Sequence, residues 1–368
     1  MEEEESKKPH IVIDNGSGFV KALFSGEYEP RVILPTCVGD EELIGKEAVE
    51  KKGVKLKYPI EHGIIKNFDE MEKIWGHVFN KELRVDPCEH NIMLTEALLN
   101  PKENREKMAQ IMFESFNAQG IYIALQPFLP IYAAGKFSGM VVELGEDLSQ
   151  FVPIFDGYDP NSNHNYNYLD TGGKDLSNYL IKLIEETGKS FSSCYRKNFA
   201  YNIKEKACYV SYDFEEEVKY YYDPYDFELP DGNHIVLEKQ RILCPEALFK
   251  LDLIGKEGSI SEMCYNTINK YKNDNSKIKD LYNGIILSGG CSMFKGLPER
   301  LTKEIKALAP EDMKEEVKVI ADSERQFNVS IGGSILSSIS TFEKYWITKT
   351  EYEELGGSIV NEKLNEKI

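Results

Sequence analysis

The amino-acid sequence predicts an α/β protein made of two related halves, and three observations support this prediction. Segment 11–21 is an apolar run, a carboxylate, a turn of small residues and a second apolar run, which is the pattern of a β-hairpin. Segment 141–155 repeats that order, and Glu143 takes the place that Asp14 holds in the first hairpin. Apolar patterns with strand and helix periods alternate along the rest of the chain. The repeat therefore predicts two α/β domains that each present one hairpin to a shared cleft.

The turn of the first hairpin has the composition of a phosphate-binding site. Gly16 and Gly18 can adopt positive φ angles and let a ligand approach the backbone closely. Consecutive backbone N–H groups in such a turn bind anions. Asp14 at its mouth suits a hydrated Mg²⁺ ion, and Lys21 can reach phosphate oxygens. The competing interpretation is a plain hairpin with an acidic residue before its turn, because short glycine motifs also match by chance.

Periodicity, glycine and proline signals predict the remaining elements. The first half is predicted to contain strands in 10–34, a short helix and a strand in 40–57, a loop at 58–63, helices at 69–83, 102–117 and 130–136, and strands at 91–96 and 121–126. The second half is predicted to contain helices at 176–187, 198–208, 296–308, 332–345 and 349–354, helical patterning at 245–271, and a strand at 283–287. The acidic, tyrosine-rich segment 213–231 is predicted to be an exposed excursion that a turn at 230–232 closes.

Composition argues against several classes of protein. The chain has 368 residues and a formal net charge of −18, which disfavours binding to nucleic acid or to an anionic membrane surface. No apolar run approaches the ~18 residues of a membrane-spanning helix, and the acidic N-terminus lacks the apolar core of a signal peptide. The seven cysteines form no CxxC pair and the six histidines show no metal-ligand spacing, so we expect reduced thiols and no zinc site.

Seven blocks of sequence resemble eukaryotic actin, in register along nearly the whole chain. These blocks lie at 14–21, 57–63, 94–97, 100–108, 287–290, 331–336 and 346–352. Sugar kinases and chaperone ATPases, which belong to the wider superfamily, share only the two hairpins and an adenosine loop with this pattern. The resemblance implies the actin fold, in which two α/β domains, each with a smaller subdomain, hold ATP or ADP in the cleft between them, with Mg²⁺ or with Ca²⁺ in its place. It implies subdomain 1 at 1–31, 58–133 and 328–368, a shortened subdomain 2 at 32–57, subdomain 3 at 134–169 and 262–327, and subdomain 4 at 170–261.

The resemblance also implies a set of site residues. The metal ion is expected near Asp14 and Glu143, through water, and hydrolysis is expected to involve Gln126, Glu143 and Gln150. Without the resemblance, Lys204 and Glu205 read as an exposed charge pair on one helical turn. The expected nucleotide contacts are Asn15, Gly16, Ser17, Gly18, Lys21, Gly145, Glu146, Asp147, Gly173, Lys204, Glu205, Gly289, Gly290, Met293, Phe294 and Gln326.

Three of these positions depart from the family pattern. Glu143 stands where actins have Asp, Gln150 stands where they have His, and Gln326 replaces a lysine on the adenine side. Glutamine orients a water molecule but does not accept its proton at neutral pH, as histidine does. We therefore expect ATP binding with slow hydrolysis. The alternative is that positioning and the metal suffice for hydrolysis, because phosphoryl transfer depends mostly on these.

Another departure concerns polymerisation. Only residues 40–44 separate Gly39 from Gly45, where actins have the long mobile loop that inserts into the next subunit of a filament. Loops tolerate deletion at little cost, so we expect the fold to survive and filament formation to be impaired or altered.

The groove that receives this loop is expected to persist in altered form. We expect it to bind actin or the amphipathic helices of profilin-, gelsolin- or cofilin-like proteins, with aromatic bulk from Phe137 and Tyr345 reshaping it. The expected lining is Tyr132, Ala133, Gly135, Phe137, Ile335, Leu336, Ile339, Thr341 and Tyr345.

The sequence thus favours an actin-like cytoskeletal protein of the cytoplasm that binds ATP–Mg²⁺, hydrolyses it slowly and polymerises poorly or differently. One alternative is a divergent actin that still forms filaments, and another is a nuclear actin-related scaffold subunit. A small-molecule kinase or chaperone ATPase of the wider superfamily is disfavoured by the actin-specific blocks. His62 lies in the block where actins carry a methylated histidine.

Overall fold

The computed structural model describes residues 8–159, 165–189, 196–229, 232–364 and 366–368. The described residues divide into two compact units. Unit 1 lies within Met1–Phe137, Ile154–His164 and Phe327–Ile368, and unit 2 within Ser138–Pro153 and Asn165–Gln326. In this part of the chain, none of the helices is long and apolar enough to cross a membrane. The finer division into four subdomains stays a prediction.

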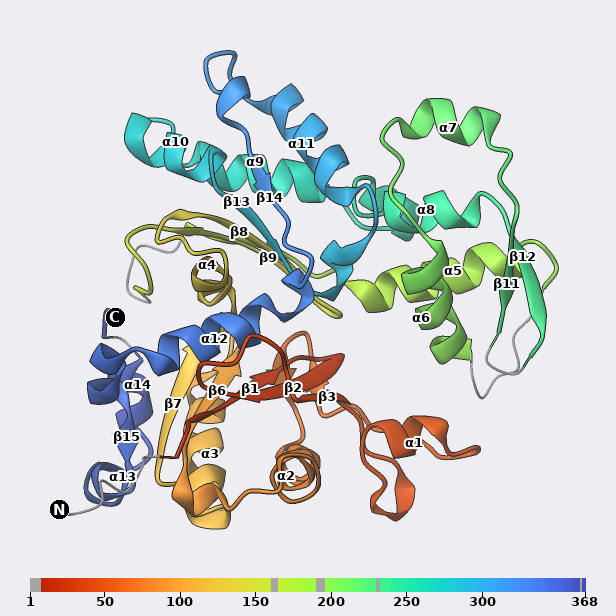
Figure 1. Ribbon diagram of the computed structural model, residues 1–368. Coiled ribbons are helices and arrows are strands. Elements are labelled where there is room, and N and C mark those ends of the chain that lie inside the picture. The colour runs from red at the N-terminus through yellow and green to blue at the C-terminus, as the bar shows by residue number, and fades with distance from the viewer. Residues whose placement is uncertain (1–7, 160–164, 190–195, 230–231, 365) are drawn as a thin grey trace. The chain divides into compact units, whose positions relative to one another are not determined.

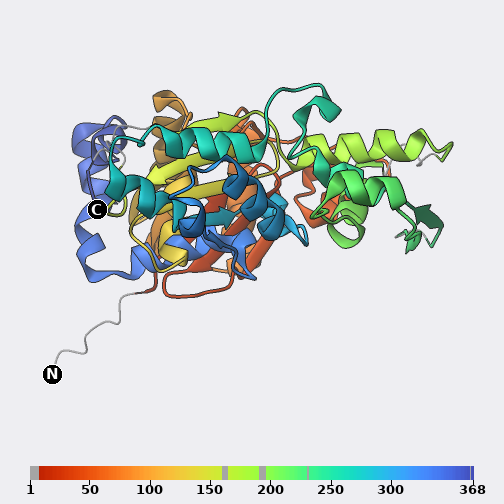
Figure 2. The ribbon, with the colours of Figure 1, turned by 90° about the horizontal axis from the view of Figure 1, so that it is seen from above.

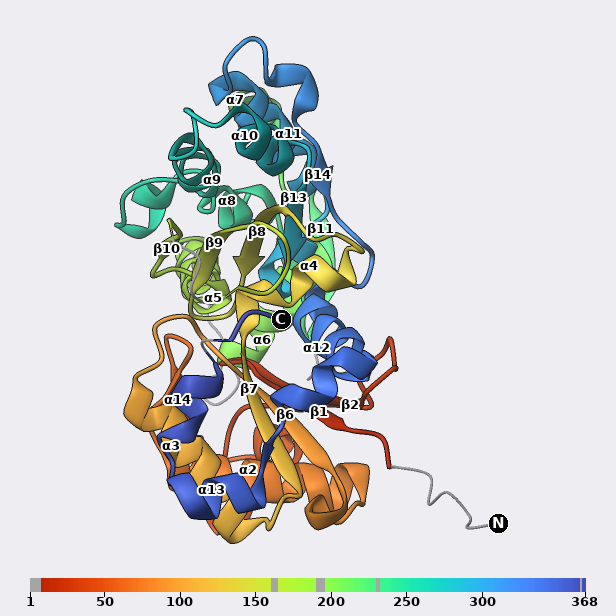
Figure 3. The ribbon, with the colours of Figure 1, turned by 90° about the vertical axis from the view of Figure 1, so that its left-hand side faces the viewer.

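A six-stranded mixed sheet forms the centre of unit 1, with the order β15–β7–β6–β1–β2–β3. Its central strands β7, β6, β1 and β2 are labelled in Figure 3. β1, β2 and β3 form an antiparallel meander, whereas β6 runs parallel to β1 and β7 runs parallel to β6. The β-branched run of β1 is buried on both faces, as a central strand covered on both sides requires. The strands are β1 Ile11–Asn15, β2 Phe19–Phe24, β3 Val32–Pro35, β6 Asn91–Glu96, β7 Gly120–Leu125 and β15 Ile347–Thr348.

Helices cover both faces of this sheet (Figure 1). On one face, α2 and α3 share an apolar core with Ile11 and Ile13 of β1. On the other face, α12 lies against β1 and β2, and a side chain on Gly333 would collide with Val12. The bounds are α2 Phe68–His77, α3 Lys102–Gln110 and α12 Asn328–Ser338, and π-helical turns continue α2 over Val78–Leu83 and α3 over Ile111–Ser115. The predicted apolar face of the first helix is confirmed, because it is fully buried at Met71, Ile74, Trp75, Val78 and Phe79.

Short elements complete unit 1. Helix α14 is fastened to α3 by Arg105, whose guanidinium donates to the buried Glu96 carboxylate and to the Asn361 side chain. The short elements are η1 Asp40–Glu42, α1 Lys46–Glu50, β4 Ile60–Glu61, β5 Ile64–Ile65, η3 Pro87–Glu89, η5 Gln126–Phe128, α4 Pro130–Ala133, η10 Ser340–Tyr345, α13 Lys349–Leu355 and α14 Ile359–Lys363.

Unit 2 repeats the strand order of unit 1 in a five-stranded sheet, β10–β9–β8–β13–β14. β10 pairs antiparallel with β9, β9 pairs with β8, and β13 lies parallel to both β8 and β14. Three successive strands followed by two parallel ones is also the order of β3–β2–β1–β6–β7 in unit 1. The strands are β8 Gly139–Leu144, β9 Ser149–Ile154, β10 Asn167–Leu169, β13 Ile285–Ser288 and β14 Val319–Ile320. The predicted repeat of two α/β halves is therefore confirmed.

Helices α9, α10 and α11 pack together on the unit 2 sheet (Figure 2). A second group of helices, α5, α6 and α8, packs around Leu176 and Ile203, which are fully buried. The remaining elements of unit 2 are α5 Gly173–Glu185, α6 Arg196–Ala207, α7 Phe214–Tyr220, β11 Tyr225–Glu228, β12 His234–Leu237, α8 Gln240–Glu246, η6 Leu251–Ile254, α9 Ile260–Asn269, α10 Asn275–Tyr282, η7 Gly290–Met293, α11 Leu297–Leu308, η8 Lys314–Glu316 and η9 Arg325–Phe327.

Several predicted strands and loops need correction. The loop predicted at 58–63 contains strand β4, which pairs with β5. The strand predicted at the end of 40–57 is a single bridge between Lys57 and Val38. The described part of segment 213–231 is mostly exposed, as predicted, but it holds α7 and β11 and buries Phe227. Its closing turn at 230–231 lies outside the described residues, as does Cys194.

Two helical predictions were also incomplete. The patterning at 245–271 is split between α8, η6 and α9, and the helix predicted at 332–345 begins at Asn328 and ends at Ser338. Helix α10 was not predicted, although Asp274 caps it by accepting a hydrogen bond from the Lys277 N–H at 3.2 Å.

Candidate functional site

Asp14 lies at the centre of a buried hydrogen-bond network in unit 1. Its Oδ1 atom accepts from the Thr95 hydroxyl at 2.9 Å and from the Gln126 amide nitrogen at 3.1 Å. Its Oδ2 atom accepts from the Lys21 ammonium at 3.0 Å. The Asp14 side chain is only 3% exposed, and these three donors compensate for the burial of its charge. The structure therefore brings together a predicted metal residue, a predicted phosphate residue and a predicted hydrolytic residue.

Asn15 fastens the end of β1 to β6. Its side-chain amide donates to the Thr95 carbonyl at 2.9 Å and accepts from the Trp75 indole at 3.0 Å. Its backbone N–H donates to the Thr95 hydroxyl at 3.0 Å. The side chain, the N–H and the carbonyl of Asn15 are thus all engaged within unit 1, and its expected contact with a nucleotide stays a prediction. Thr95 is a site residue that sequence reasoning did not single out.

The turn between β1 and β2 depends on glycine for a steric reason. Neither Gly16 nor Gly18 uses a positive φ angle, contrary to the conformation considered from the sequence. A Cβ atom on Gly16 would instead lie 2.6 Å from the Phe19 carbonyl oxygen, closer than any side chain tolerates. The Ser17 hydroxyl accepts a hydrogen bond from the Gly63 N–H at 3.3 Å, which links the turn to the β4–β5 hairpin.

Unit 2 presents a turn of the same construction between β8 and β9. The Gly145 N–H donates to the Leu148 carbonyl at 3.0 Å, and a Cβ atom on Gly145 would lie 2.9 Å from that oxygen. Glu143 precedes Gly145 at the same offset at which Asp14 precedes Gly16. The two turns therefore share their acidic residue, their glycine and the close approach of the carbonyl three residues later.

The first turn of α5 holds this second turn in place. The N–H of Gly173 donates to the Gly145 carbonyl at 3.0 Å, and the N–H of Lys174 donates to the Glu146 carbonyl at 2.9 Å. The Lys174 ammonium also lies 3.5 Å from the Asp147 carboxylate. Residues 145–147 are thus held by backbone hydrogen bonds from a helix end and by an ion pair of the Asp147 side chain.

A cluster of polar side chains surrounds Gly173. The Lys204 ammonium is buried, donates to the Gly173 carbonyl at 2.7 Å and lies 3.7 Å from the Glu146 carboxylate. Burial raises the pKa of the Glu146 carboxyl, and the charge of Lys204 opposes this shift. A Cβ atom on Gly173 would lie between 2.4 and 2.8 Å from Glu146, Cys291 and Lys204. Lys204 and Glu205 do not form an exposed pair, since only Glu205 is exposed.

The loop after β13 approaches the second turn closely. Gly289 has a φ angle of +87°, and a Cβ atom there would lie 2.3 Å from the Leu144 carbonyl oxygen, so only glycine fits. Gly290, in contrast, faces open space. Arg325, which the sequence did not single out, holds the loop: its guanidinium donates to the Ser292 carbonyl at 2.9 Å, and its own carbonyl accepts from the Gly289 N–H at 3.1 Å. Of the other predicted nucleotide contacts near this loop, Met293 and Gln326 are half-buried and Phe294 is buried.

Two buried hydroxyls near these loops lack a hydrogen-bond partner among the described residues. They belong to Thr171, next to the glycines that begin α5, and to Ser288, which pairs with Glu143 in the β13–β8 register. An unsatisfied buried hydroxyl costs about 1–3 kcal/mol. Together with the open space at Gly290, these groups fit a polar ligand at this end of the unit 2 sheet.

The residues expected to act on water differ in their surroundings. Gln126 is buried and its amide nitrogen is fully engaged within unit 1. Gln150 is buried on β9 of unit 2, opposite Tyr168 of β10. Within the described ranges, no three His, Cys, Asp or Glu side chains gather to hold a metal ion directly.

The residues expected to line a partner groove gather around α4 and α12 in unit 1. The ring of Phe137 is 68% exposed and stands edge-on to Tyr132, with the ring centres 6.4 Å apart. Tyr345, however, is buried, and its hydroxyl donates to the Lys367 carbonyl at 2.7 Å. The expectation that both aromatic residues reshape the groove is therefore corrected, since only Phe137 reaches the surface. Of the others, Tyr132 and Leu336 are buried, Ala133 and Ile335 are half-buried, and Gly135, Ile339 and Thr341 are exposed.

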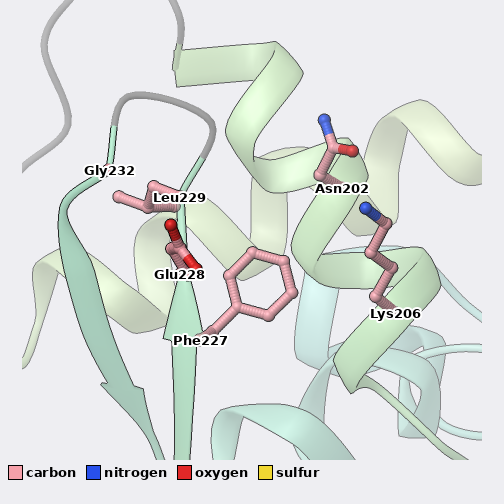
Figure 4. Close-up of a pocket in the computed structure, with 6 residues that line it drawn as sticks. All are labelled: Asn202, Lys206, Phe227, Glu228, Leu229 and Gly232. Atoms are coloured by element: carbon pink, nitrogen blue, oxygen red, sulfur yellow. The ribbon is translucent and has the colours of Figure 1, made fainter.

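A cavity of about 480 Å³ lies elsewhere in unit 2, between α6 and the β11–β12 hairpin (Figure 4). Asn202 and Lys206 are one helical turn apart on α6 and both line it. None of the predicted site residues lines this cavity, which is formed by Asn202, Lys206, Phe227, Glu228, Leu229 and Gly232.

The chain matches the model of a known protein family. The family model described as actin matches residues 5–365, which is nearly the whole chain. The match includes both glycine turns, the Gly173 cluster and the residues around α4 and α12. It confirms at the level of the family the resemblance that the seven sequence blocks showed.

Proposed function

Since the chain belongs to the actin family, we propose that it binds ATP with Mg²⁺, hydrolyses the nucleotide slowly and forms filaments poorly or differently. The observation that supports nucleotide binding best is the pair of matching turns at equivalent points of two sheets with the same strand order. Such turns offer several backbone N–H groups to phosphate oxygens. We therefore assign the phosphates to the turns that begin at Gly16 and Gly145.

Lys204 and its neighbours support the adenosine part of this proposal. Lys204 is held in place by the Gly173 carbonyl and Glu146, so a ligand meets an already oriented ammonium group. Gly289 and Gly290 leave the adjacent loop without side chains, and the orphaned Ser288 hydroxyl gains a partner when a polar ligand is present.

The proposed slow hydrolysis follows from the residues available to act on water. A Mg²⁺ ion held through water near Asp14 and Glu143 would neutralise phosphate charge. Gln126 is anchored to Asp14, so it is positioned to orient a water molecule. Gln150 has no basic group that could take a proton from that water at neutral pH. Since a general base contributes about 10²- to 10⁴-fold to rate, its loss predicts retained binding with slow turnover.

The segment between Gly39 and Gly45 supports altered polymerisation. The Gly39 N–H donates to the Leu43 carbonyl at 2.8 Å, and the Gly45 N–H donates to the Cys37 carbonyl at 2.9 Å. The segment is thus folded back on itself as a closed turn and does not extend as an insertion loop. We infer that this segment does not make the longitudinal filament contact that the long loop of actins makes.

Exposed apolar side chains support binding of a partner helix. Phe137 and Ile339 are 68% and 40% exposed around α4 and α12, and an amphipathic helix buries such side chains with its apolar face. We assign this surface to actin or to actin-binding proteins, and we propose that the protein acts in the cytoplasm with the cytoskeleton. The alternative is that the protein acts in the nucleus as a scaffold subunit.

Calorimetric titration with ATP, in Mg²⁺ and in EDTA, tests the nucleotide proposal, and sedimentation with electron microscopy tests polymerisation. We expect one ATP per chain, tighter binding with Mg²⁺, and little protein in the pellet. Ordinary ATP-dependent filaments would instead identify a divergent but polymerising actin. Phosphate transfer to a small substrate in a coupled assay would identify a kinase and overturn the proposal.

A further inference from the structure

The Thr95 hydroxyl, on β6, makes three hydrogen bonds with candidate site residues. Its oxygen accepts from the Asn15 N–H at 3.0 Å and from the Gln126 amide nitrogen at 3.1 Å. Its single proton goes to Asp14 Oδ1, at 2.9 Å. A hydroxyl offers one donor and two acceptor positions, and all three are used here. The direction of the Thr95 proton is therefore fixed.

This direction determines how the Gln126 amide is oriented. Its nitrogen Nε2 lies 3.1 Å from each of three oxygens, on Thr95, on Asp14 and on the Asn15 backbone. The carboxylate and the carbonyl only accept hydrogen bonds, and the Thr95 proton is committed to Asp14. If the amide were flipped, its oxygen would face three acceptors and the buried groups would lose their donor, which is costly. The NH₂ group is therefore locked toward Asp14, with Oε1 on the opposite side.

We propose that Thr95 is a positioning residue that makes Gln126 present its carbonyl oxygen, rather than its NH₂ group, to the water that attacks the nucleotide. This inference rests on the proposed function, because it assigns the water-facing atom of the same site. An acceptor oxygen takes a hydrogen bond from the water and leaves the lone pairs of the water oxygen free to face the phosphorus. An NH₂ group would occupy one of those lone pairs. Thr95 therefore controls the rate of hydrolysis more than the affinity for ATP.

Three substitutions separate this role from a general effect on folding. Thr95→Val keeps the shape of the side chain and removes the hydroxyl, whereas Thr95→Ser restores the hydroxyl without the methyl group. Thr302→Val is the matched control, because it removes a hydroxyl that donates to the Pro298 carbonyl at 2.7 Å on α11 of the other unit. If Thr95→Val does not fold, Thr95→Cys replaces it, since a thiol is a weak donor and acceptor.

Single-turnover phosphate release and ATP affinity are measured for each variant. We expect Thr95→Val to slow phosphate release about tenfold to a hundredfold, as misplaced catalytic groups do, with a much smaller change in ATP affinity. Thr95→Ser should restore most of the rate that Thr95→Val loses, and Thr302→Val should release phosphate at the wild-type rate. A Thr95→Val protein that hydrolyses as fast as the wild type would overturn the proposal.

A second readout does not depend on hydrolysis. The chain has six glutamines, so ¹⁵N-glutamine labelling gives a simple NMR spectrum in which Gln126→Glu identifies the Gln126 amide. We expect its NH₂ protons to exchange slowly in the wild type and in Thr95→Ser, and quickly in Thr95→Val. Equal exchange in all three would overturn the locking of the amide. A wild-type chain that binds no ATP would overturn the proposed function, and the exchange comparison would still decide whether Thr95 holds the amide.

Discussion

The substitution Asp14→Asn keeps the shape of the side chain and removes its charge. The carbonyl oxygen of the new side chain can still accept from Thr95 and Gln126, so two of the three hydrogen bonds survive. The third is lost, because the NH₂ group that replaces Oδ2 faces the Lys21 ammonium, which lies 3.0 Å from Oδ2 in the native chain. The variant therefore isolates the charge of Asp14 from its role in the network.

The size of the effect on stability follows from the exposure of Lys21. A hydrogen bond to a charged group contributes about 1.5–3 kcal/mol. The Lys21 side chain is 18% exposed and can turn toward water, which lowers the cost. We expect a loss of about 1–2 kcal/mol in the free energy of unfolding of the ligand-free protein, seen as a fall of a few degrees in Tm.

The nucleotide assay tests the function of the same charge. ATP affinity is measured with Mg²⁺ and with EDTA for the wild type, for Asp14→Asn and for Asp312→Asn, which changes an exposed aspartate outside the site. We expect the increase in ATP affinity that Mg²⁺ causes to be about tenfold smaller in Asp14→Asn than in the wild type, a difference of about 1.4 kcal/mol. Without metal, Asp14→Asn should bind ATP no more weakly than the wild type. An unchanged Mg²⁺ gain in Asp14→Asn would refute the placement of the metal beside Asp14.

Three further outcomes are expected from other parts of the chain. Gln150→His should speed single-turnover phosphate release about a hundredfold by supplying a proton acceptor, and an unchanged rate would show that the base is not what limits turnover. Gly289→Ala should lower the free energy of unfolding in urea by about 2–4 kcal/mol, because its positive φ angle and its backbone contact exclude a side chain, whereas Gly290→Ala should be nearly neutral. Burial raises the pKa of Cys37 to about 11, so at pH 8 its thiolate is scarce. A hydrogen bond with Asp86 raises the pKa of Cys88 as well, but Cys88 is only half-buried. Mass spectrometry should therefore find iodoacetamide on Cys88 well before the buried Cys37, and equal labelling would contradict the structure.

The sequence allowed the two hairpins and the central strands to be predicted because their signals are local. Asp14 and Glu143 each precede a glycine by two positions and follow an apolar run, so the repeat is visible without any tertiary information. The strand predicted at 91–96 has the same bounds as β6. Signals of this kind depend only on neighbours along the chain.

The supporting residues of the site could not be predicted in this way. Thr95 reads as an ordinary residue of a buried strand, and its partners Asn15 and Gln126 lie 80 and 31 positions away. Arg325 is 33 positions from the Ser292 carbonyl that it holds. The contacts of Thr95 arise only when the unit 1 sheet has formed, because β6 lies between β1 and β7.

Tyr345 shows how a surface prediction fails for a similar reason. An aromatic residue at that position was expected to reshape the groove, but it is buried and bonded to the Lys367 carbonyl. Phe137, at the end of a short helix and a turn, meets no such segment and stays exposed. Burial of an aromatic side chain depends on which distant backbone covers it, and the sequence pattern alone does not contain this information.

A single-turnover experiment with γ-labelled ATP tests the central claim most directly, because it reports binding and hydrolysis in one sample. Protein in excess over ATP is mixed with Mg²⁺, bound nucleotide is separated by rapid filtration, and released phosphate is followed over time. We expect ATP to be bound completely in a Mg²⁺-dependent manner and phosphate to appear only slowly afterwards. No bound nucleotide, or phosphate release as fast as binding, would contradict the account.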